Sequence, residues 1–428
     1  MTDASFFRKE IIPPSAPPPG LTGPWNWART NLFPGPISSI QTVVFGALAI
    51  WLVVWAFPWF WYSNWTAPNL RTCRELIGDT GGGCFAFFTE RWHQFLFGST
   101  FPATERWRMV LSFVLMLVAL APLLYPMLPR RMTYFSIAFP FLVIWLIWGG
   151  TLWLPIMIAL GFGLGWLAYR LARPLGNLGA SIIAVVVPIL WWYFLASEVA
   201  DQLSQFIGLK LPVIQSRNLG GLAIAVIIGL SGILLSLPLG ILLALGRQSN
   251  LFILHAVSVG FIEFIRGVPL ITILIAAQSV LGYFLPPGTN FDIVLRVIIL
   301  VTLFSAAYNA ETIRGALAAL PRGQYEAANS MGMDYWTSQR LIILPQAMKI
   351  SIPGIVGNFI GLFKDTTLVS IIGIYDLVGL FGPLDASTDW KGIYWEFYFI
   401  IAVIFFIICF SMSRYSIWLE RRLRTDIR

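Results

Sequence analysis

The stretch ISSIQTVVFGALAIWLVVWAFPWFW, from Ile37 to Trp61, contains no charged residue. A second long apolar run, WEFYFIIAVIFFIICFSMSRYSIW, occupies residues 395–418. Runs of about 20 residues match a helix that crosses a hydrocarbon core about 30 Å thick. Only helices and closed barrels can span a membrane, and a barrel would show segments of about ten residues with alternating polarity. These runs therefore predict transmembrane helices.

The composition agrees with this prediction. Hydrophobic residues make up 57% of the chain and charged residues 11%, and the mean hydropathy is +0.77. A soluble domain is about half apolar and roughly a quarter charged. We therefore expect an all-α polytopic membrane protein. The predicted spans lie near 38–61, 108–128, 133–149, 152–172, 180–200, 219–245, 252–285, 291–313, 342–373 and 393–419. The ranges 133–149 and 152–172 also fit a single re-entrant hairpin.

The distribution of positive charge predicts the orientation of these spans. Arginine and lysine are concentrated on one side of the membrane when both termini are placed in the cytoplasm. The first 36 residues are rich in proline and precede the first apolar run, so no cleavable secretory signal is expected. We predict a cytoplasmic tail that ends in an interfacial helix near PWNWARTNLF, residues 24–33.

The predicted outer loop, residues 62–107, contains two of the three cysteines. Cys73 and Cys84 are eleven residues apart. A disulfide fits an oxidising outer compartment, and two free, buried thiols are the alternative.

Motifs for catalysis and metal binding are missing. The sequence has no G-x-x-x-x-G-K-[ST], G-x-S-x-G or H-E-x-x-H pattern, and its two histidines stand alone, so we expect no metal site. The glycines of GFGLG, residues 161–165, lie in an apolar span and indicate close helix packing rather than a phosphate loop. An enzyme is therefore not expected.

The segment QYEAANSMGMDYWTSQRLIILP, residues 324–345, is a polar stretch between apolar runs. We expect two short helices here, because Pro321 suits a helix start and Gly332 suits the left-handed residue that ends a helix. Residues 333–344 would form the second helix and lead into the next span. Such a knob fits a groove on another protein, with Glu326 offering a charge. An ordinary solvated loop is the alternative.

The spacing in this segment resembles the cytoplasmic coupling loop of permease subunits of binding-protein-dependent ABC importers. The residues that fit the pattern E-A-A-x3-G-x9-I-x-L-P are Glu326, Ala327, Ala328, Gly332, Ile342, Leu344 and Pro345. FIEFIRGVPLI, AAYNAETIRGAL and FKDTTLVSIIG resemble the polar amino acid permeases of that family, with Thr367 where serine is expected. ERWRMVLSF and other parts of the front half resemble the longer general L-amino-acid subgroup.

The resemblance implies a division of the chain and a set of partners. It implies a five-span type I permease core at 211–428 with the coupling loop at 320–345, a transmembrane extension at 37–210 and the tail at 1–36, with eight to ten spans in total. Such a subunit lies in the bacterial inner membrane and imports L-amino acids together with a second, related permease. Two ATPase subunits bind ATP and Mg²⁺, a periplasmic binding protein delivers the cargo, and this chain itself holds no cofactor. A self-sufficient, ion-coupled secondary transporter is the first alternative, although no internal repeat is visible. A membrane scaffold with no pore is the second.

Polar side chains inside spans are candidates for the substrate pathway, because they are costly in lipid. The first group is Lys364, Asp365, Thr366 and Thr367. A helix that breaks here and restarts at Thr366 would direct backbone N–H groups at a carboxylate. In the alternative, Lys364 and Asp365 pair with each other or Asp365 only caps a helix.

Two neutral side chains, Gln278 and Asn309, are further candidates for hydrogen bonds to an amino acid. Charged pairs with i, i+3 spacing are expected near the inner membrane face. Glu311 and Arg314 fit a structural salt bridge, and Glu263 and Arg266 fit a gating or structural pair. Arg296 is expected to extend toward the outer membrane surface.

Overall fold

The computed structural model describes residues 23–125, 127–284 and 292–423. It divides into two compact units, Met1–Ala86 and Phe87–Arg428. The predicted division at residue 210 stays a prediction.

From residue 23 onward, the first unit contains three α-helices before Gly78, which are α1 (Pro24–Leu32), α2 (Pro36–Trp61) and α3 (Leu70–Ile77). No residue of α2 is buried, so its long apolar surface is available to lipid or to another chain. A disulfide joins Cys73 and Cys84, whose Cα atoms are 6.0 Å apart, and both residues are buried. The disulfide interpretation of these two cysteines therefore agrees with the structure.

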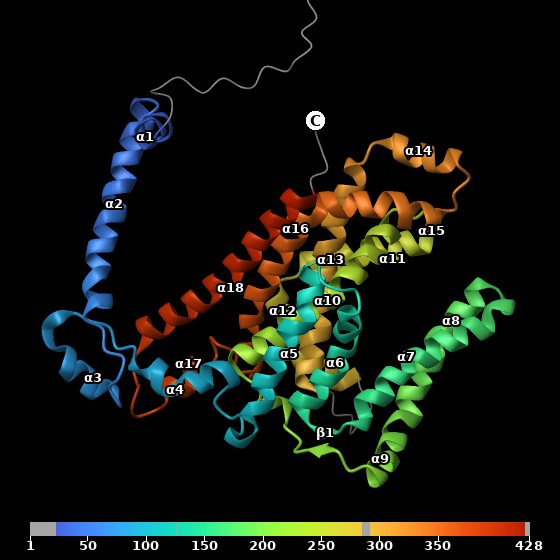
Figure 1. Cartoon of the computed structure of the whole chain (residues 1–428), viewed down its shortest axis with the longest axis horizontal. Coiled ribbons are helices and arrows are strands. Elements are labelled where there is room, and N and C mark those ends of the chain that lie inside the picture. Colours follow the sequence, from blue (N-terminus) through green and yellow to red (C-terminus); the bar gives the residue numbers. More distant parts are fainter. Residues whose placement is uncertain (1–22, 126, 285–291, 424–428) are drawn as a thin grey trace, which may run out of the picture. The chain divides into compact units, whose positions relative to one another are not determined.

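The second unit is almost entirely helical (Figure 1). Its helices before residue 210 are α4 (Ala86–Phe97), α5 (Arg106–Leu124), α6 (Met132–Trp148), α7 (Trp153–Ala172), α8 (Asn177–Leu190) and α9 (Ala196–Phe206). Those after residue 210 are α10 (Gly221–Arg247), α11 (Phe252–Gly267), α12 (Leu270–Phe284), α13 (Ile293–Ala319), α14 (Arg322–Ser330), α15 (Tyr335–Ser338), α16 (Leu344–Asp365), α17 (Phe381–Asp385) and α18 (Tyr394–Leu423). One short antiparallel pair, β1 (Gly150–Thr151) with β2 (Lys210–Leu211), links the loops at the ends of α6 and α9.

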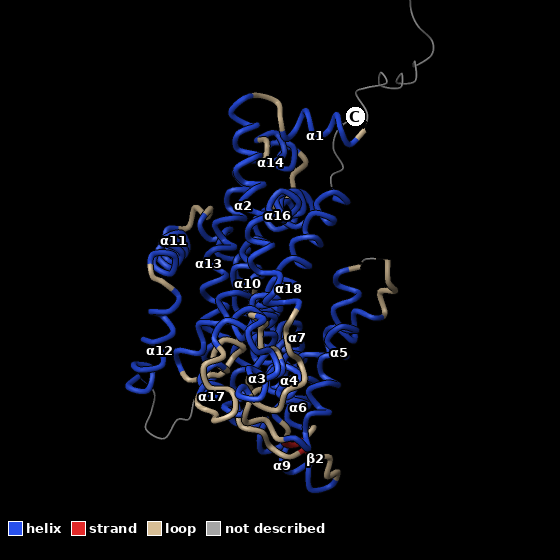
Figure 2. The backbone as a smooth tube through the Cα atoms, turned by 90° about the vertical axis from the view of Figure 1, so that its left-hand side faces the viewer, coloured by secondary structure: helices blue, strands red, loops and turns tan. Residues whose placement is uncertain are grey.

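Among the described residues, eight helices are long and apolar enough to cross a membrane. The predicted ranges 133–149 and 152–172 form two separate helices, the shorter α6 and the full-length α7. The predicted span at 252–285 is formed by two helices that together are long and apolar enough for a broken span, and residue 285 lies outside the described residues. The two helices are α11 and α12, which are bent by 101° (Figure 2). The bend follows from Pro269, because a proline pushes the preceding residue out of the helical region, and Val268 is extended with φ −112° and ψ 131°.

The centre of the second unit is the packing of α10 along α13 and of α13 along α16. Small residues allow these helices to approach closely, as is common in membrane proteins. A Cβ atom on Gly240 of α10 would lie 2.8 Å from the Cβ of Asn309 on α13. In the extension, Gly161 and Gly165 of α7 are packed in the same way against Trp192 and Pro188, while Gly163 faces open space. The expected helix contact in GFGLG is therefore formed by its first and last glycines.

The extension and the later helices share one hydrophobic cluster. Met109 of α5 and Ile147 of α6 are buried together with Ile224 of α10 and Val297 of α13. A fully buried arginine reinforces this junction. The Arg108 guanidinium donates hydrogen bonds to the carbonyls of Leu146 (2.6 Å), Ile147 (3.4 Å) and Pro212 (2.9 Å), and it pairs with Glu105 at 3.1 Å. It thereby satisfies carbonyls at the end of α6 that a helix leaves free.

Candidate functional site

The polar segment between α13 and α16 forms two short helices, α14 and α15 (Figure 1). Gly332 ends α14 with φ +68°, a left-handed conformation that glycine adopts at little cost. Its N–H donates to Asn329 O (2.9 Å), and the N–H of Met333 donates to Ala328 O (3.2 Å). These two bonds form a Schellman motif, which satisfies the last carbonyls of the helix. Asp334 then caps α15 by accepting the N–H of Thr337 at 3.3 Å.

One side of this loop is anchored and the other is exposed. Ala328 is fully buried, Ile342 and Leu344 pack against the buried cluster that contains Ile343, and Pro345 lies in the first turn of α16. Gln346 donates a hydrogen bond to Gln324 at 3.0 Å and ties α16 to α14. The exposed side chains include Glu326, Ala327, Met331, Tyr335 and Trp336. The loop is therefore a fixed knob with a free surface.

The second expected helix of this loop, 333–344, is not one regular α-helix. It begins as α15, passes through a π-helical turn at Gln339–Ile343 and continues without a gap as α16. Hydrophobic periodicity does not reveal such a turn, because the insertion of one residue changes the spacing only locally.

A cavity of about 270 Å³ lies between α13 and α16. It is lined by Phe304, Ser305, Tyr308, Gly357, Asn358, Gly361, Leu362 and Asp365. Ser305 is 3% exposed, and its hydroxyl has no hydrogen-bond partner among the described residues. Asp365 belongs to the predicted pathway group, whereas Ser305, Tyr308 and Asn358 were not among the predicted residues. The signal that could have found them is the polar character of these side chains within apolar spans.

Asn309, a predicted pathway residue, is fully buried behind this cavity rather than in its wall. Its amide donates to Ser236 Oγ of α10 at 3.2 Å and accepts from Asn358 Nδ2 at 3.0 Å. Asn358 also donates to Thr312 Oγ1 at 3.0 Å. This chain of hydrogen bonds connects α10, α13 and α16, so Asn309 holds Asn358 in place at the cavity wall.

The expected break at Lys364–Thr367 is absent, which corrects the sequence prediction. α16 ends at Asp365 and continues directly as a 3₁₀ helix, Thr366–Ile372. The N–H of Thr366 donates to the carbonyls of Leu362 and Lys364, so no free helix start faces an anion. The hydroxyls of Thr366 and Thr367 donate to Phe363 O and Lys364 O, at 2.8 and 2.9 Å. Lys364 is exposed, and no ion pair joins it to Asp365 in the described part of the chain.

Gln278 lies on α12, away from the residues that line the cavity. Its amide oxygen accepts a hydrogen bond from Arg296 Nη1 of α13 at 2.8 Å. Arg296 is half-buried, so it does not extend freely to the membrane surface as expected. The pair therefore connects α12 to α13.

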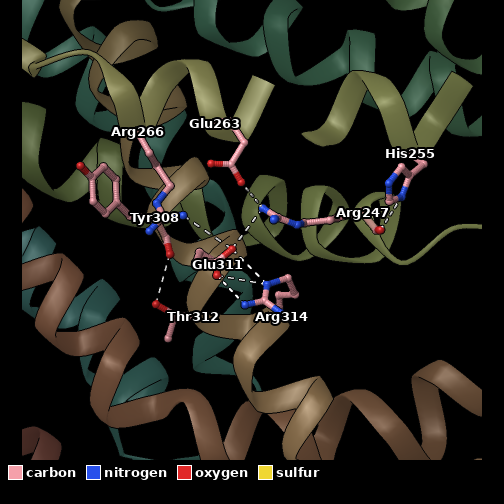
Figure 3. A network of polar contacts seen from close by, with 8 residues as sticks. All are labelled: Arg247, His255, Glu263, Arg266, Tyr308, Glu311, Thr312 and Arg314. Atoms are coloured by element: carbon pink, nitrogen blue, oxygen red, sulfur yellow. Dashed lines mark hydrogen bonds and ion pairs between the residues drawn. The ribbon is translucent and has the colours of Figure 1, made fainter. Parts of the chain in front are cut away.

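A network of ion pairs connects the C-terminal parts of α10, α11 and α13 (Figure 3). Glu311 Oε1 is 2.6 Å from Arg314 Nη2, and Glu311 Oε2 is 3.2 Å from Arg247 Nη1. Arg247 also pairs with Glu263 at 2.8 Å, and Arg266 Nη1 lies 3.7 Å from Glu311 Oε2. The expected Glu311–Arg314 pair is present, whereas Glu263 and Arg266 contact other partners instead of each other.

Asp376 is a buried carboxylate in the loop that follows the 3₁₀ helix. It accepts N–H bonds from Val378 (3.3 Å) and Gly379 (2.9 Å). Burial outweighs these bonds and raises the pKa of Asp376 to about 6. The N–H of Gly221 donates to the neighbouring Tyr375 O at 2.8 Å, so this loop is fixed to the start of α10.

An α-helical protein with multiple apolar spans, an exposed two-helix knob and a polar cavity between its central helices has the architecture of a membrane transport subunit. Residues 236–425 match the family model described as binding-protein-dependent transport system inner membrane component. The chain is 50% identical, over 100% of both chains, to the glutamate/glutamine/aspartate/asparagine transport system permease protein BztC of Rhodobacter capsulatus. It is 37% identical, over 93% of both chains, to the inner membrane amino-acid ABC transporter permease protein YhdY of Escherichia coli.

A solved structure, described as the crystal structure of an amino acid ABC transporter with histidines, covers 46% of this chain and 90% of its own at 32% identity and a TM-score of 0.42. The length and identity of the sequence matches are sufficient to assign the family. The chain belongs to the amino-acid ABC transporter permeases and is the permease subunit, a non-catalytic component, of such an importer.

Proposed function

We propose that the chain imports L-amino acids as one of two related permeases and that α14 and α15 connect it to a separate ATPase subunit. The observation that carries this proposal is the form of the loop. Ala328 and Ile343 anchor it in the core, while Glu326, Ala327 and Trp336 remain free. A rigid knob of this kind can transmit the movement of a partner into α13 and α16, which begin or end beside it.

The proposed orientation follows from this contact. ATP is hydrolysed in the cytoplasm, so the ends of α10, α13 and α16 nearest to α14 face the cytoplasm, as do both termini. ATP and Mg²⁺ are bound by the ATPase subunits, and a periplasmic binding protein delivers the cargo at the other side of the inner membrane.

The cavity between α13 and α16 is the proposed cargo site. Asp365 supplies an acceptor for the ammonium group, and the Ser305 hydroxyl and the Asn358 amide oxygen supply neutral hydrogen-bonding groups. Such pockets combine apolar walls with a few placed polar groups. The relative from Rhodobacter capsulatus is named for glutamate, glutamine, aspartate and asparagine. We therefore propose that the cargo of this chain includes acidic amino acids and their amides.

The test uses the complete complex, purified by a tag on this chain after expression together with its natural partner genes. Identification of the co-purified chains tests the partner proposal. Reconstituted into vesicles with the binding protein and ATP, the wild-type complex should take up labelled L-glutamate, and a panel of unlabelled amino acids should compete according to the cargo class. Uptake without ATP, driven by an ion gradient, would contradict the proposal.

A charge reversal tests the coupling contact. Glu326→Lys should lower ATP-driven uptake at least tenfold without loss of the permease chains from the complex, because it repels a basic partner surface. Glu75→Lys is the matched control, since Glu75 is an exposed carboxylate on α3, outside the candidate membrane spans. Equal uptake by the two variants would contradict the assignment of the loop.

A further inference from the structure

The three arginines around Glu311 differ in the number of hydrogen bonds that they donate to carboxylates (Figure 3). Arg314 donates three hydrogen bonds of 2.6 to 3.1 Å to the Glu311 carboxylate. Arg247 donates one to Glu311 (3.2 Å) and one to Glu263 (2.8 Å). Arg266 approaches Glu311 only to 3.7 Å, beyond hydrogen-bond distance. No described residue accepts a hydrogen bond from its guanidinium, and 34% of its side chain is exposed.

The network also carries a surplus of positive charge. Three arginines face two carboxylates, those of Glu263 and Glu311, across the described contacts. The network also includes two neutral titratable side chains, Tyr308 and His255, and the Nδ1 of His255 is 2.7 Å from the carbonyl oxygen of Arg247 rather than from a charged group. A cation without a full partner is costly near a membrane interior, and such groups usually mark the path of an ion or a substrate.

Tyr308 connects this surplus charge to the cargo cavity. Its side chain lines the cavity, and the guanidinium of Arg266 lies over its ring, 5.7 Å from the centroid. Arg266 and Arg314 approach Glu311 from opposite sides in Figure 3, and Arg266 is the one on the side of Tyr308. A guanidinium that rests on an aromatic face keeps the N–H donors of its edge available.

The cavity and Arg266 therefore offer separate binding groups for the two charged ends of an amino acid. Asp365 lies in the cavity wall and suits the ammonium group, whereas Arg266 lies beyond Tyr308, toward α14. A guanidinium binds a carboxylate through two parallel hydrogen bonds, which no group of the cavity wall can provide. We propose that Arg266 receives a carboxylate of the cargo as it leaves the cavity toward the cytoplasm, and that the surplus charge excludes cationic amino acids. This inference rests on the proposed function, which supplies the cargo and the direction.

The experiment measures equilibrium binding of labelled L-glutamate to the purified complex in the absence of the binding protein. Arg266→Gln should raise the Kd for L-glutamate at least tenfold. Arg266→Lys keeps the charge but loses the two parallel hydrogen bonds of the guanidinium, so it should raise the Kd less than Arg266→Gln does. Lys349→Gln is the control, because it removes a positive charge from an exposed side chain near the start of α16 without changing the contacts of Glu311. The Kd of this control should change less than threefold if L-glutamate binds Arg266 directly. A larger change would be expected if only the total positive charge of the region attracted it.

Three results would overturn the inference. They are an unchanged Kd in Arg266→Gln, equal losses in Arg266→Gln and Lys349→Gln, and the absence of saturable binding to a wild-type complex that transports L-glutamate. Competition in the wild-type complex gives a test that needs no variant. L-arginine at hundredfold excess should not displace L-glutamate, and displacement would contradict the exclusion of cations. In all of these cases ATP-driven uptake of L-glutamate by the wild type would leave the proposed function intact, whereas its absence would refute the proposed function itself.

Discussion

Substitution of Gly332 tests whether the rigidity of the α14–α15 loop matters for transport. Gly332 has φ +68° and open space around its Cα, so a side chain there meets no neighbour and acts only through the backbone. A β-branched residue in the left-handed region is a strong conformational outlier, whereas asparagine tolerates it better. The series glycine, asparagine and valine therefore changes backbone strain at one exposed position.

The expected magnitude follows from the cost of this conformation. Strain at such a position is roughly 1–3 kcal/mol for valine, and about 1.4 kcal/mol corresponds to a tenfold change in an equilibrium. In Gly332→Val, the equilibrium between the formed and the open turn at Gly332 and Met333 should thus shift toward the open turn by a factor of roughly 5 to 150. Asparagine should cause a smaller loss.

The assay is ATP-driven uptake of L-glutamate by the reconstituted complex, with ATP hydrolysis measured in the same vesicles. Gly332→Val should lower the number of amino acids transported per ATP hydrolysed at least fivefold, with Gly332→Asn between it and the wild type. Gly46→Val is the control, because Gly46 lies in α2 with ordinary helical φ and open space. Wild-type coupling in Gly332→Val would refute the reasoning, and so would an equal effect of Gly46→Val.

Further predictions concern other parts of the chain. Arg108→Met should destabilise the folded chain by about 3–5 kcal/mol, because it leaves Glu105 without its partner, and the melting temperature in detergent should fall accordingly. Asn358→Leu should lower L-glutamate uptake at least fivefold while the complex still assembles, because the cavity loses its amide; normal uptake would exclude Asn358 from the pathway. The pKa of Asp376 is about 6, above the ordinary 3.8 of an unfolded chain, so its charged form destabilises the fold above pH 6. Thermal stability should therefore rise from pH 7 to pH 5, and Asp376→Asn should remove this part of the change; a wild-type slope in that variant would contradict it. Alkylation without reductant should leave Cys73 and Cys84 unmodified, and mass spectrometry of labelled peptides would detect a free thiol.

The sequence predicted the helices of this protein well, because long apolar runs determine them almost directly. The bend between α11 and α12 could have been predicted from Val268-Pro269, since the signal is local. The continuation of α16 into a 3₁₀ helix was harder to foresee. The Lys-Asp-Thr-Thr polar group suggested a break, but the threonine hydroxyls bond to carbonyls of the same helix and compensate for the tighter turn.

The candidate site was predictable only where its residues are consecutive. The loop around Gly332 has a fixed local spacing, and its turn geometry follows from that spacing. The cavity and the ion network depend on which side chains of distant helices meet, as Arg247 does with Glu311 and Asn309 with Asn358. Helix periodicity shows on which side of its helix a residue lies, but it does not show which other helix packs against that side. These pairs could therefore be found only in the structure.

The junction around Arg108 has a consequence for any attempt to simplify this permease. A chain shortened to begin at residue 211 would keep every helix from α10 onward but lose Met109 and Ile147, and the side of α10 and α13 that they cover would become an open apolar seam. The carbonyl of Pro212 would lose its guanidinium donor at the same time. The added helices have become part of what folds the transport core, so a minimal version of this subunit has to be redesigned at that seam instead of being cut there.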